Sequence, residues 1–269
     1  MVTLAIALAT GGAIASALFF GCDLGGGWSI FGGIAAFGTV QIGVGLHLRK
    51  QVAAAMKAVE ATLLEGQKAA QAKMQRWQMR PPGSVQAAQA EIERDQRKFV
   101  SEALRLTEPL HRFDPWVPMM KRQIATAQFQ LYWMIKEYRK CDALLEKALF
   151  VDPTMYAMKM ARYYMLDKPT AEIRKVYEKG SKRLRYNQNV LLAAAWTWIL
   201  VRRGEIDEAF KALNDALRNS DNEVLKANRD ALANNRVAHF SNSGIGDTWW
   251  ALALEEPKVK MQRQRMQWR

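Results

Sequence analysis

Two long apolar stretches stand at the start of the chain, separated by five residues. Residues 1–22 and 28–48 contain no Asp, Glu, Lys or Arg, and Asp23 is the single charged residue among the first 48. A helix needs about 20 apolar residues to cross the ~30 Å hydrocarbon layer of a bilayer, so both stretches are long enough. Residues 23–27 read Asp-Leu-Gly-Gly-Gly, which is typical of a turn. The pattern predicts a transmembrane helical hairpin over residues 1–48.

Three other interpretations of this start remain open. A cleaved signal peptide normally begins with positive charge, which this sequence lacks. A lipoprotein would carry its lipid on Cys22, but the preceding Phe-Phe-Gly is a poor match to the small residues expected there. The third interpretation is a buried hairpin of a soluble protein. The membrane hairpin is favoured because two apolar spans lie side by side in the sequence. Small residues such as Gly11 and Gly33 would let the spans pack closely.

After residue 48 the sequence takes on the pattern of a charged helix. Residues 49–83 are rich in Ala, Lys, Gln, Met and Glu, which favour helix, until Pro81-Pro82-Gly83 breaks the chain. The pattern predicts a basic stalk helix that continues out of the second span. Four apolar residues recur at seven-residue spacing, namely Met56, Leu63, Ala70 and Trp77. This spacing leaves open a coiled coil in a homo-oligomer.

A new helix is predicted to begin after Ser84, which can cap it, and to run to about Thr107. Residues 110–118 read as a turn, in which Asp114-Pro115 offers another helix start. The residues expected to be buried by the helix are Val85, Ile92, Phe99, Ala103 and Leu106.

Three segments farther along have the same periodic pattern. Residues 136–153, 168–187 and 202–221 each read as the second helix of a helical pair. Aligning Cys141, Ile173 and Ala209 gives spacings of 32 and 36 residues. Matching apolar or small residues then follow at Leu145, Tyr177 and Leu213 and at Ala148, Gly180 and Ala216.

This pattern resembles the tetratricopeptide repeat (TPR), whose period is about 34 residues. The first copy also ends in the Asp-Pro that is typical of the family, at Asp152-Pro153. The Trp and Leu-Gly positions of the first helices are not matched. The resemblance covers residues 120–222 and implies an all-α chain with a TPR-like α-solenoid over residues 84–256. Its last helices are expected at 224–234 and 248–255, with Asp247 as a cap and a loop between them.

In this family the first helices of successive pairs line a concave groove that grips a peptide or a partner helix. The resemblance therefore implies a site for unknown proteins or peptides. Its Met and Trp side chains would give adaptable apolar contact and its Arg side chains would select acidic groups. The positions carried over are Gln130, Trp133, Met134, Met158, Arg162, Met165, Trp198 and Arg202.

Charge sets the predicted orientation. The net charge is +13, and residues 49–80 carry seven basic against two acidic side chains, while the turn at 23–27 has no basic residue. Basic residues flanking membrane helices stay on the cytoplasmic side. We therefore expect a multi-pass protein of the inner (cytoplasmic) membrane with both termini and residues 49–269 in the cytoplasm. The tail 257–269 adds five basic residues, so stalk and tail could bind anionic lipid or RNA.

No arrangement of residues predicts catalysis, a metal site or a cofactor. The three histidines are far apart in the sequence, and Gly244-Ile245-Gly246 lacks the Lys-Ser/Thr of a phosphate loop. Cys22 and Cys141 form no paired motif. We expect a non-enzymatic, membrane-anchored scaffold or adaptor that binds partner proteins. The alternative is a membrane-tethered docking factor for nucleic acid or ribosomes that uses the basic stalk and tail.

Overall fold

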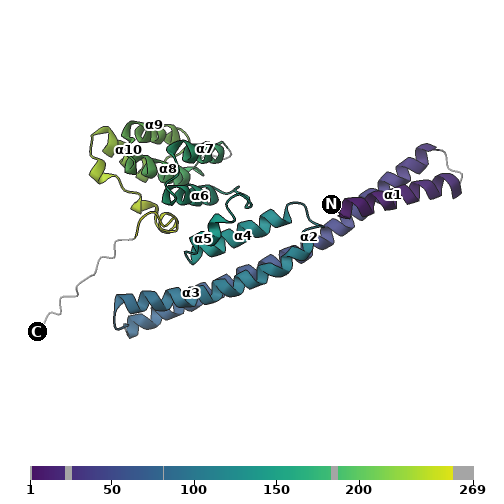
Figure 1. The fold of residues 1–269 in the computed structure, drawn as a ribbon, viewed down its shortest axis with the longest axis horizontal. Helices are drawn as coiled ribbons and strands as arrows, with labels where there is room; N and C mark the ends of the chain where they lie inside the picture. The colour runs from purple at the N-terminus through teal and green to yellow at the C-terminus, as the bar shows by residue number, and fades with distance from the viewer. Residues whose placement is uncertain (1, 22–25, 81, 183–186, 257–269) are drawn as a thin grey trace, which may run out of the picture. The chain divides into compact units, whose positions relative to one another are not determined.

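The computed structural model describes residues 2–21, 26–80, 82–182 and 187–256, and within these ranges every regular element is a helix (Figure 1). The all-α prediction is confirmed. The helices form two compact units, the first ending at Leu149 and the second beginning at Phe150. This boundary lies inside the predicted domain 84–256. The predicted tail 257–269 lies outside the described residues.

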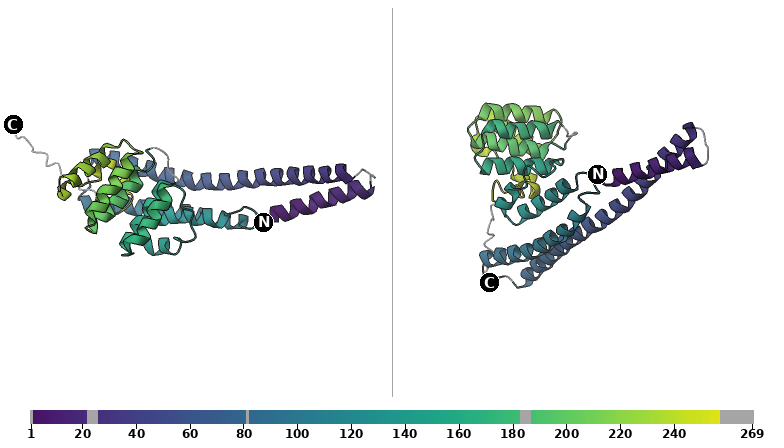
Figure 2. Two further views of the ribbon diagram at one scale, coloured as in Figure 1. Left: turned by 90° about the horizontal axis from the view of Figure 1, so that it is seen from above. Right: turned by 45° about the vertical axis from the view of Figure 1, so that its right-hand side comes forward.

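Two long apolar helices open the first unit. α1 (Val2–Gly21) and α2 (Gly26–Met79) lie side by side in Figures 1 and 2. The small residues allow close contact, because a methyl group on Gly33 would lie 2.8 Å from the carbonyl oxygen of Gly11. The predicted turn lies mostly outside the described residues, and its last two glycines belong to α2.

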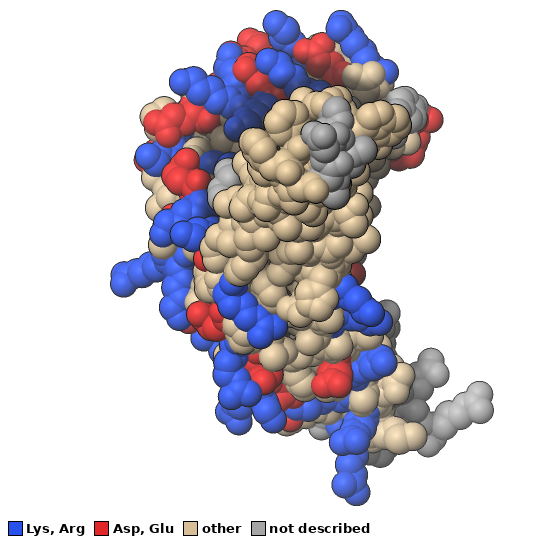
Figure 3. Space-filling model, turned by 90° about the vertical axis from the view of Figure 1, so that its right-hand side faces the viewer, with Lys and Arg blue, Asp and Glu red and all other residues tan. Residues whose placement is uncertain are grey.

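The apolar side chains of these two helices are mostly exposed. Each contains a window long and apolar enough to cross a membrane, and the buried share of those windows is 17% in α1 and 11% in α2. Their apolar side chains therefore point mostly outward. Figure 3 looks toward this hairpin and shows a broad face without Lys, Arg, Asp or Glu.

The predicted stalk is the continuation of α2, and α3 (Val85–Thr107) folds back along it (Figures 1 and 2). Ser84 caps α3 as predicted, since its hydroxyl accepts the N–H of Ala87 at 3.1 Å. Lys73 bridges the two helices through Glu91, at 2.7 Å, and Asp95.

The contact between stalk and α3 is apolar. Met56 and Leu63 of the seven-residue seam pack against buried clusters within the chain, so this part of the seam is covered without a second copy. Ala103 is buried as predicted, whereas Ile92, Phe99 and Leu106 are only half-buried. The side chain of Val85 lies outside the description. Val100 is also buried, although the sequence did not single it out.

The predicted helix start at Asp114-Pro115 is wrong. A 3-10 helix, η1 (Glu108–Phe113), is followed by turns, and α4 (Met120–Met134) begins six residues after Asp114. Asp114 is already in helical conformation, with φ −52° and ψ −44°, rather than in the extended conformation of a cap. Its Oδ2 lies 3.0 Å from His111 Nδ1 instead of accepting a backbone N–H of a new helix.

The predicted helix 136–153 is mostly wrong as well. Only α5 (Tyr138–Asp142) is helical, and several N–H groups between 144 and 147 bond to carbonyls three residues back. The N–H of Leu149 donates to the hydroxyl of Thr126 at 2.7 Å, so a side chain of α4 takes the place of a helical partner.

In the second unit, the helices from α6 to α10 pack as a stack. α6 packs against α7 and α8, α8 against α9, and α9 against α10. Asp152 and Asn222 cap α6 and α10 through their side-chain oxygens. The bounds are α6 (Pro153–Met165), α7 (Thr170–Ser181), α8 (Val190–Arg202), α9 (Ile206–Leu217) and α10 (Glu223–Ala233).

The aligned positions of the repeat pattern share their environment. Cys141, Ile173 and Ala209 are each fully buried. A methyl group on Gly180 would lie 2.9 Å from Leu192 Cδ2 and 3.0 Å from Tyr156 Cγ, so a small residue fits closely where α7 meets α6 and α8. The spacing found in the sequence therefore marks positions that are buried in the structure.

The chain ends differently from the prediction. The loop after α10 contains two short 3-10 helices, η2 (Val237–His239) and η3 (Ser243–Ile245). α11 (Asp247–Trp250) replaces the predicted helix 248–255. Asp247 is its first residue rather than its cap, which is Gly246 at φ 82°. The left-handed φ of 54° at Ala253 prevents a continuous helix and turns the chain back toward α8.

Candidate binding groove in the second unit

Trp198 is the centre of the candidate site. It lies on α8, an almost entirely apolar helix, and its side chain is 5% exposed. Tyr164 and Trp249 meet it edge to face, with ring centroids 5.2 Å and 6.0 Å away. Aromatic neighbours in this geometry fix the orientation of an indole ring, so the direction of its N–H is set before anything binds.

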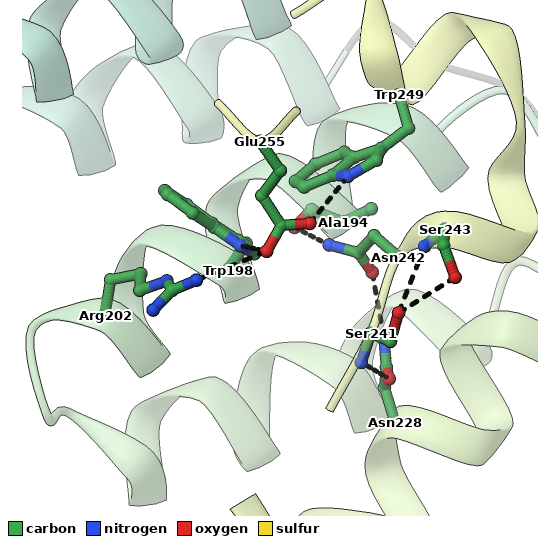
Figure 4. Close-up of polar contacts among 9 residues, drawn as sticks. All are labelled: Ala194, Trp198, Arg202, Asn228, Ser241, Asn242, Ser243, Trp249 and Glu255. Atoms are coloured by element: carbon green, nitrogen blue, oxygen red, sulfur yellow. Dashed lines mark hydrogen bonds and ion pairs between the residues drawn. The ribbon is translucent and has the colours of Figure 1, made fainter. Parts of the chain in front are cut away.

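Three donors converge on one carboxylate (Figure 4). Glu255 Oε1 accepts the indole N–H of Trp198 at 2.8 Å and a guanidinium N–H of Arg202 at 3.3 Å. Glu255 Oε2 accepts the indole N–H of Trp249 at 3.0 Å. An indole nitrogen and a guanidinium can only donate, so this corner is built to hold an anion.

Arg202 is placed by the same ring. Its guanidinium carbon lies 5.0 Å from the centre of the Trp198 ring, while the side chain stays 55% exposed. A cation over an indole face is attracted by the ring and keeps its remaining N–H groups available. The exposed arginine is therefore the part of the corner that an outside ligand can reach.

Asparagine side chains hold the neighbouring loop in place (Figure 4). Asn242 is fully buried and donates to the carbonyl of Ala194 on α8 at 3.1 Å. Asn228 of α10 donates to Asn242 Oδ1 at 2.8 Å and accepts the backbone N–H of Ser241 at 2.8 Å. Buried amides that are bonded on both sides fix a loop firmly. The loop is thus a rigid wall.

These elements enclose an open groove with a cavity volume of about 1000 Å³. Its floor is α8, and its walls are the loop after α10 and the segment that follows α11. The lining residues are Trp198, Val201, Arg202, Val237, Ala238, Phe240, Ser241, Ser243, Trp250, Leu254, Glu255 and Glu256. The groove thus combines apolar side chains with one cationic corner.

The eight residues predicted for a groove are divided between the two units. Gln130, Trp133 and Met134 belong to α4 of the first unit. Trp133 is 4% exposed and stacks on Phe129 with ring centroids 5.8 Å apart, which makes it a packing residue there. Gln130 and Met134 are exposed.

The other five predicted residues belong to the second unit. Met158 is buried within α6, where Arg162 and Met165 are half-buried and 4.0 Å apart from Nη1 to sulfur. Trp198 and Arg202 line the groove described above. A common surface for all eight residues therefore stays a prediction.

The sequence missed Trp249, Glu255 and Asn242 as parts of the site. The tryptophan pair at 249–250 followed by two glutamates was a usable signal, because indole N–H groups need acceptors when they are buried. The predicted straight helix 248–255 hid this connection. Only the turn at Ala253 brings Glu255 back to Trp249.

A second hollow, of about 640 Å³, lies between α7 and α9. Tyr177 stacks on Trp196 there, with ring centroids 5.5 Å apart and planes at 17°. Burial, and to a smaller degree the negative charge of Asp215, raises the pKa of Tyr177 to about 12. Arg174 and Glu208 form an ion pair across the hollow. Charged side chains of both signs line this hollow.

Across the described ranges, no group of three or more His, Cys, Asp or Glu side chains is placed to hold a metal ion. Comparison with protein families, curated proteins and solved structures finds no match to this chain. The geometry of the groove therefore carries the functional argument.

Proposed function

We propose that this protein is a membrane-anchored adaptor that binds an acidic segment of a partner protein in the groove beside Trp198. The observation that carries the proposal is the convergence of three N–H donors on the Glu255 carboxylate. The chain's own acidic segment fills a position that a glutamate or aspartate of a partner would fill. The TPR-like spacing of the helical pairs supports the same class of function, because stacked pairs commonly grip extended peptides.

The anchor in this proposal is the α1–α2 hairpin. Its apolar windows keep most of their side chains exposed, which in water would be unfavourable and in lipid is not. The basic residues that follow the second span favour a cytoplasmic location for both units. The localisation we propose is the inner membrane, with N-in and C-in orientation.

The alternative is a docking factor for nucleic acid or ribosomes that would use the basic stalk and tail. In the stalk, Lys73 is committed to Glu91 and Asp95 of α3, while the other six basic residues of 49–80 are exposed. The carboxylates of Asp95 and Glu91 raise the pKa of Lys73. Its positive charge is therefore already paired within the chain.

The experiment uses the full-length chain in lipid nanodiscs and a fluorescent peptide with the sequence of residues 251–256. Glu255→Gln removes the charged occupant of the groove and keeps its shape. Charge-assisted hydrogen bonds contribute about 1.5–3 kcal/mol, so we expect the variant to bind the peptide at least about tenfold more tightly than the wild type. Glu256→Gln is the matched control, because the neighbouring glutamate makes none of the three bonds.

Two further measurements make the result decisive. Arg202→Gln in the Glu255→Gln background should abolish the gain, and a peptide with Gln at both acidic positions should not bind. Circular dichroism checks that each variant keeps its helical content. If folded Glu255→Gln protein binds the peptide no better than the wild type, Glu255 is only a structural clamp and the proposal fails.

A further inference from the structure

The segment 108–122, which joins α3 to α4, lies beside the ends of both apolar spans. α3 runs antiparallel to the stalk, since Asp95 meets Lys73, Phe99 meets Gly66, and Val100 clusters with Val59. At 1.5 Å per residue, the 31 residues of α2 after Leu48 carry the chain roughly 45 Å outward, and α3 brings it back. We name residues 108–122 the return segment.

The return segment packs against the last residues of the second span. Leu110, Phe113 and Met120 form a buried cluster with Ile124, and α2 residues pack against this cluster. Those α2 residues are Leu48, Val52, Ala55 and Met56. Leu48 is the last residue before Arg49, where the apolar stretch ends. The return segment is therefore level with the end of the second span.

The first span supplies an independent marker of the same level. The backbone N–H of Val2, at the start of α1, donates to the carbonyl of Pro115 at 3.1 Å. Figures 1 and 2 show the N-terminal end of α1 next to the segment between α3 and α4. Two span ends, far apart in the sequence, thus meet the same short segment.

The surface of the return segment has the chemistry of a membrane interface. Met119, at the tip, is 61% exposed and adopts a left-handed φ of 62°. Trp116 is half-buried, and the exposed basic residues are Arg112, Lys121 and Arg122. The acidic side chains in the segment are Glu108 and Asp114, and Asp114 lies against His111. Apolar tips flanked by basic residues favour the headgroup layer of an anionic leaflet.

We propose that the return segment rests in the headgroup layer and binds anionic phospholipid, with Met119 inserted and Arg112, Lys121 and Arg122 on the phosphates. This inference rests on the proposed membrane anchoring of α1 and α2. It adds a third contact with the bilayer that hydropathy does not detect, because the segment is short and charged.

The test places a fluorescent label on single cysteines of the full-length protein, reconstituted in nanodiscs with lipids that carry a headgroup-level quencher. Cys22 is replaced by Ser, and the buried Cys141 is left in place. The label sites are Met119→Cys, Leu46→Cys within the second span and Ser101→Cys on the exposed face of α3. We expect quenching at 46 and 119 and none at 101.

The outcomes separate the two proposals. If position 46 is quenched and 119 is not, the return segment stays in water and this inference is overturned, while the anchor stands. If neither is quenched, the membrane anchor itself is wrong.

The second part of the test varies the share of anionic lipid. Raising the share of anionic lipid from none to one third should increase quenching at 119 severalfold. Lys121→Gln/Arg122→Gln should remove most of that increase, since each basic residue near the surface changes binding about fivefold. The matched control is Arg139→Gln/Lys140→Gln, an exposed basic pair beyond the other end of α4. Equal quenching in neutral and anionic lipid would contradict phosphate binding.

Discussion

α1 and α8 are both apolar helices without acidic residues, yet α1 is mostly exposed within its unit and α8 is mostly buried within its own. α1 has 20 residues, of which Ala7 and Gly11 are buried. α8 has 13 residues and buries nine in an unbroken run from Leu192 to Leu200. Hydropathy alone does not separate a lipid-facing helix from the core helix of a helical stack. Length and burial do, because a 13-residue helix of about 20 Å is too short for the hydrocarbon layer.

The largest expected effect tests the burial of α8. Ile199→Asp places a charge at a fully buried position of α8 and should unfold the second unit, at a cost of about 5 kcal/mol or more. Limited proteolysis and thermal melting by circular dichroism would detect it. Leu166→Asp is the control, because Leu166 is 41% exposed after α6 and its replacement should change little. Similar melting of both variants would mean that α8 is not the core.

The next largest effect tests the proposed insertion of α1 into a bilayer. Leu8 is 58% exposed on α1, so in water Leu8→Asp would be harmless. In a bilayer it should cost about 2.5–3.5 kcal/mol and reduce the inserted fraction, as measured by resistance to carbonate extraction. Met74→Asp is the matched change on the stalk part of α2, where a 47% exposed methionine should face water. Unchanged insertion of Leu8→Asp would argue that α1 lies outside the hydrocarbon layer.

A smaller effect tests how the two spans pack. Gly33→Leu would force a side chain into a site where a methyl group already lies 2.8 Å from the Gly11 carbonyl oxygen. Overpacking of this kind costs about 1–3 kcal/mol, so unfolding in mixed detergent should occur at a lower denaturant concentration. Gly38→Leu serves as the control, because nothing lies within 4 Å of a methyl group at Gly38. If the two variants unfold alike, the hairpin does not depend on this close contact.

Long and short elements differ in how well the sequence predicts them. Long, uniform patterns were reliable: the apolar spans, the continuous stalk and the Ser84 cap appear as expected, since each depends on local composition or a local hydrogen bond. Short elements whose ends are set by distant side chains were not. The Leu149 N–H bonds to Thr126, and Glu255 bonds to Trp198, and neither partner is near in the sequence.

The dependence on distant side chains also explains why the sequence predicted only part of the candidate site. Two of the eight predicted residues, Trp198 and Arg202, line the groove, because helical spacing placed them on one face of α8. Their acidic partner comes from 53 residues or more beyond, after a left-handed turn at Ala253 that a leucine- and alanine-rich sequence gives no reason to expect. Residue spacing located the donors, and only the tertiary structure located the acceptor.

The smallest effect uses pH to report on the second unit alone. The pKa of Tyr177 rises from its ordinary value of 10.0 to about 12, chiefly because the phenol is buried against Trp196. A raised pKa means that the folded state holds the proton more tightly, so this stabilisation is complete below pH 10 and is lost as pH rises toward 12. At pH 11 the loss should be about 1.4 kcal/mol.

Tyr177→Phe cannot ionise, so its free energy of unfolding should fall less between pH 9 and pH 11 than that of the wild type. Measuring both proteins at both pH values cancels the cost of losing the hydroxyl, which is the same at either pH. An equal fall for both would place the Tyr177 hydroxyl in water in the folded protein and would contradict its burial beside Trp196.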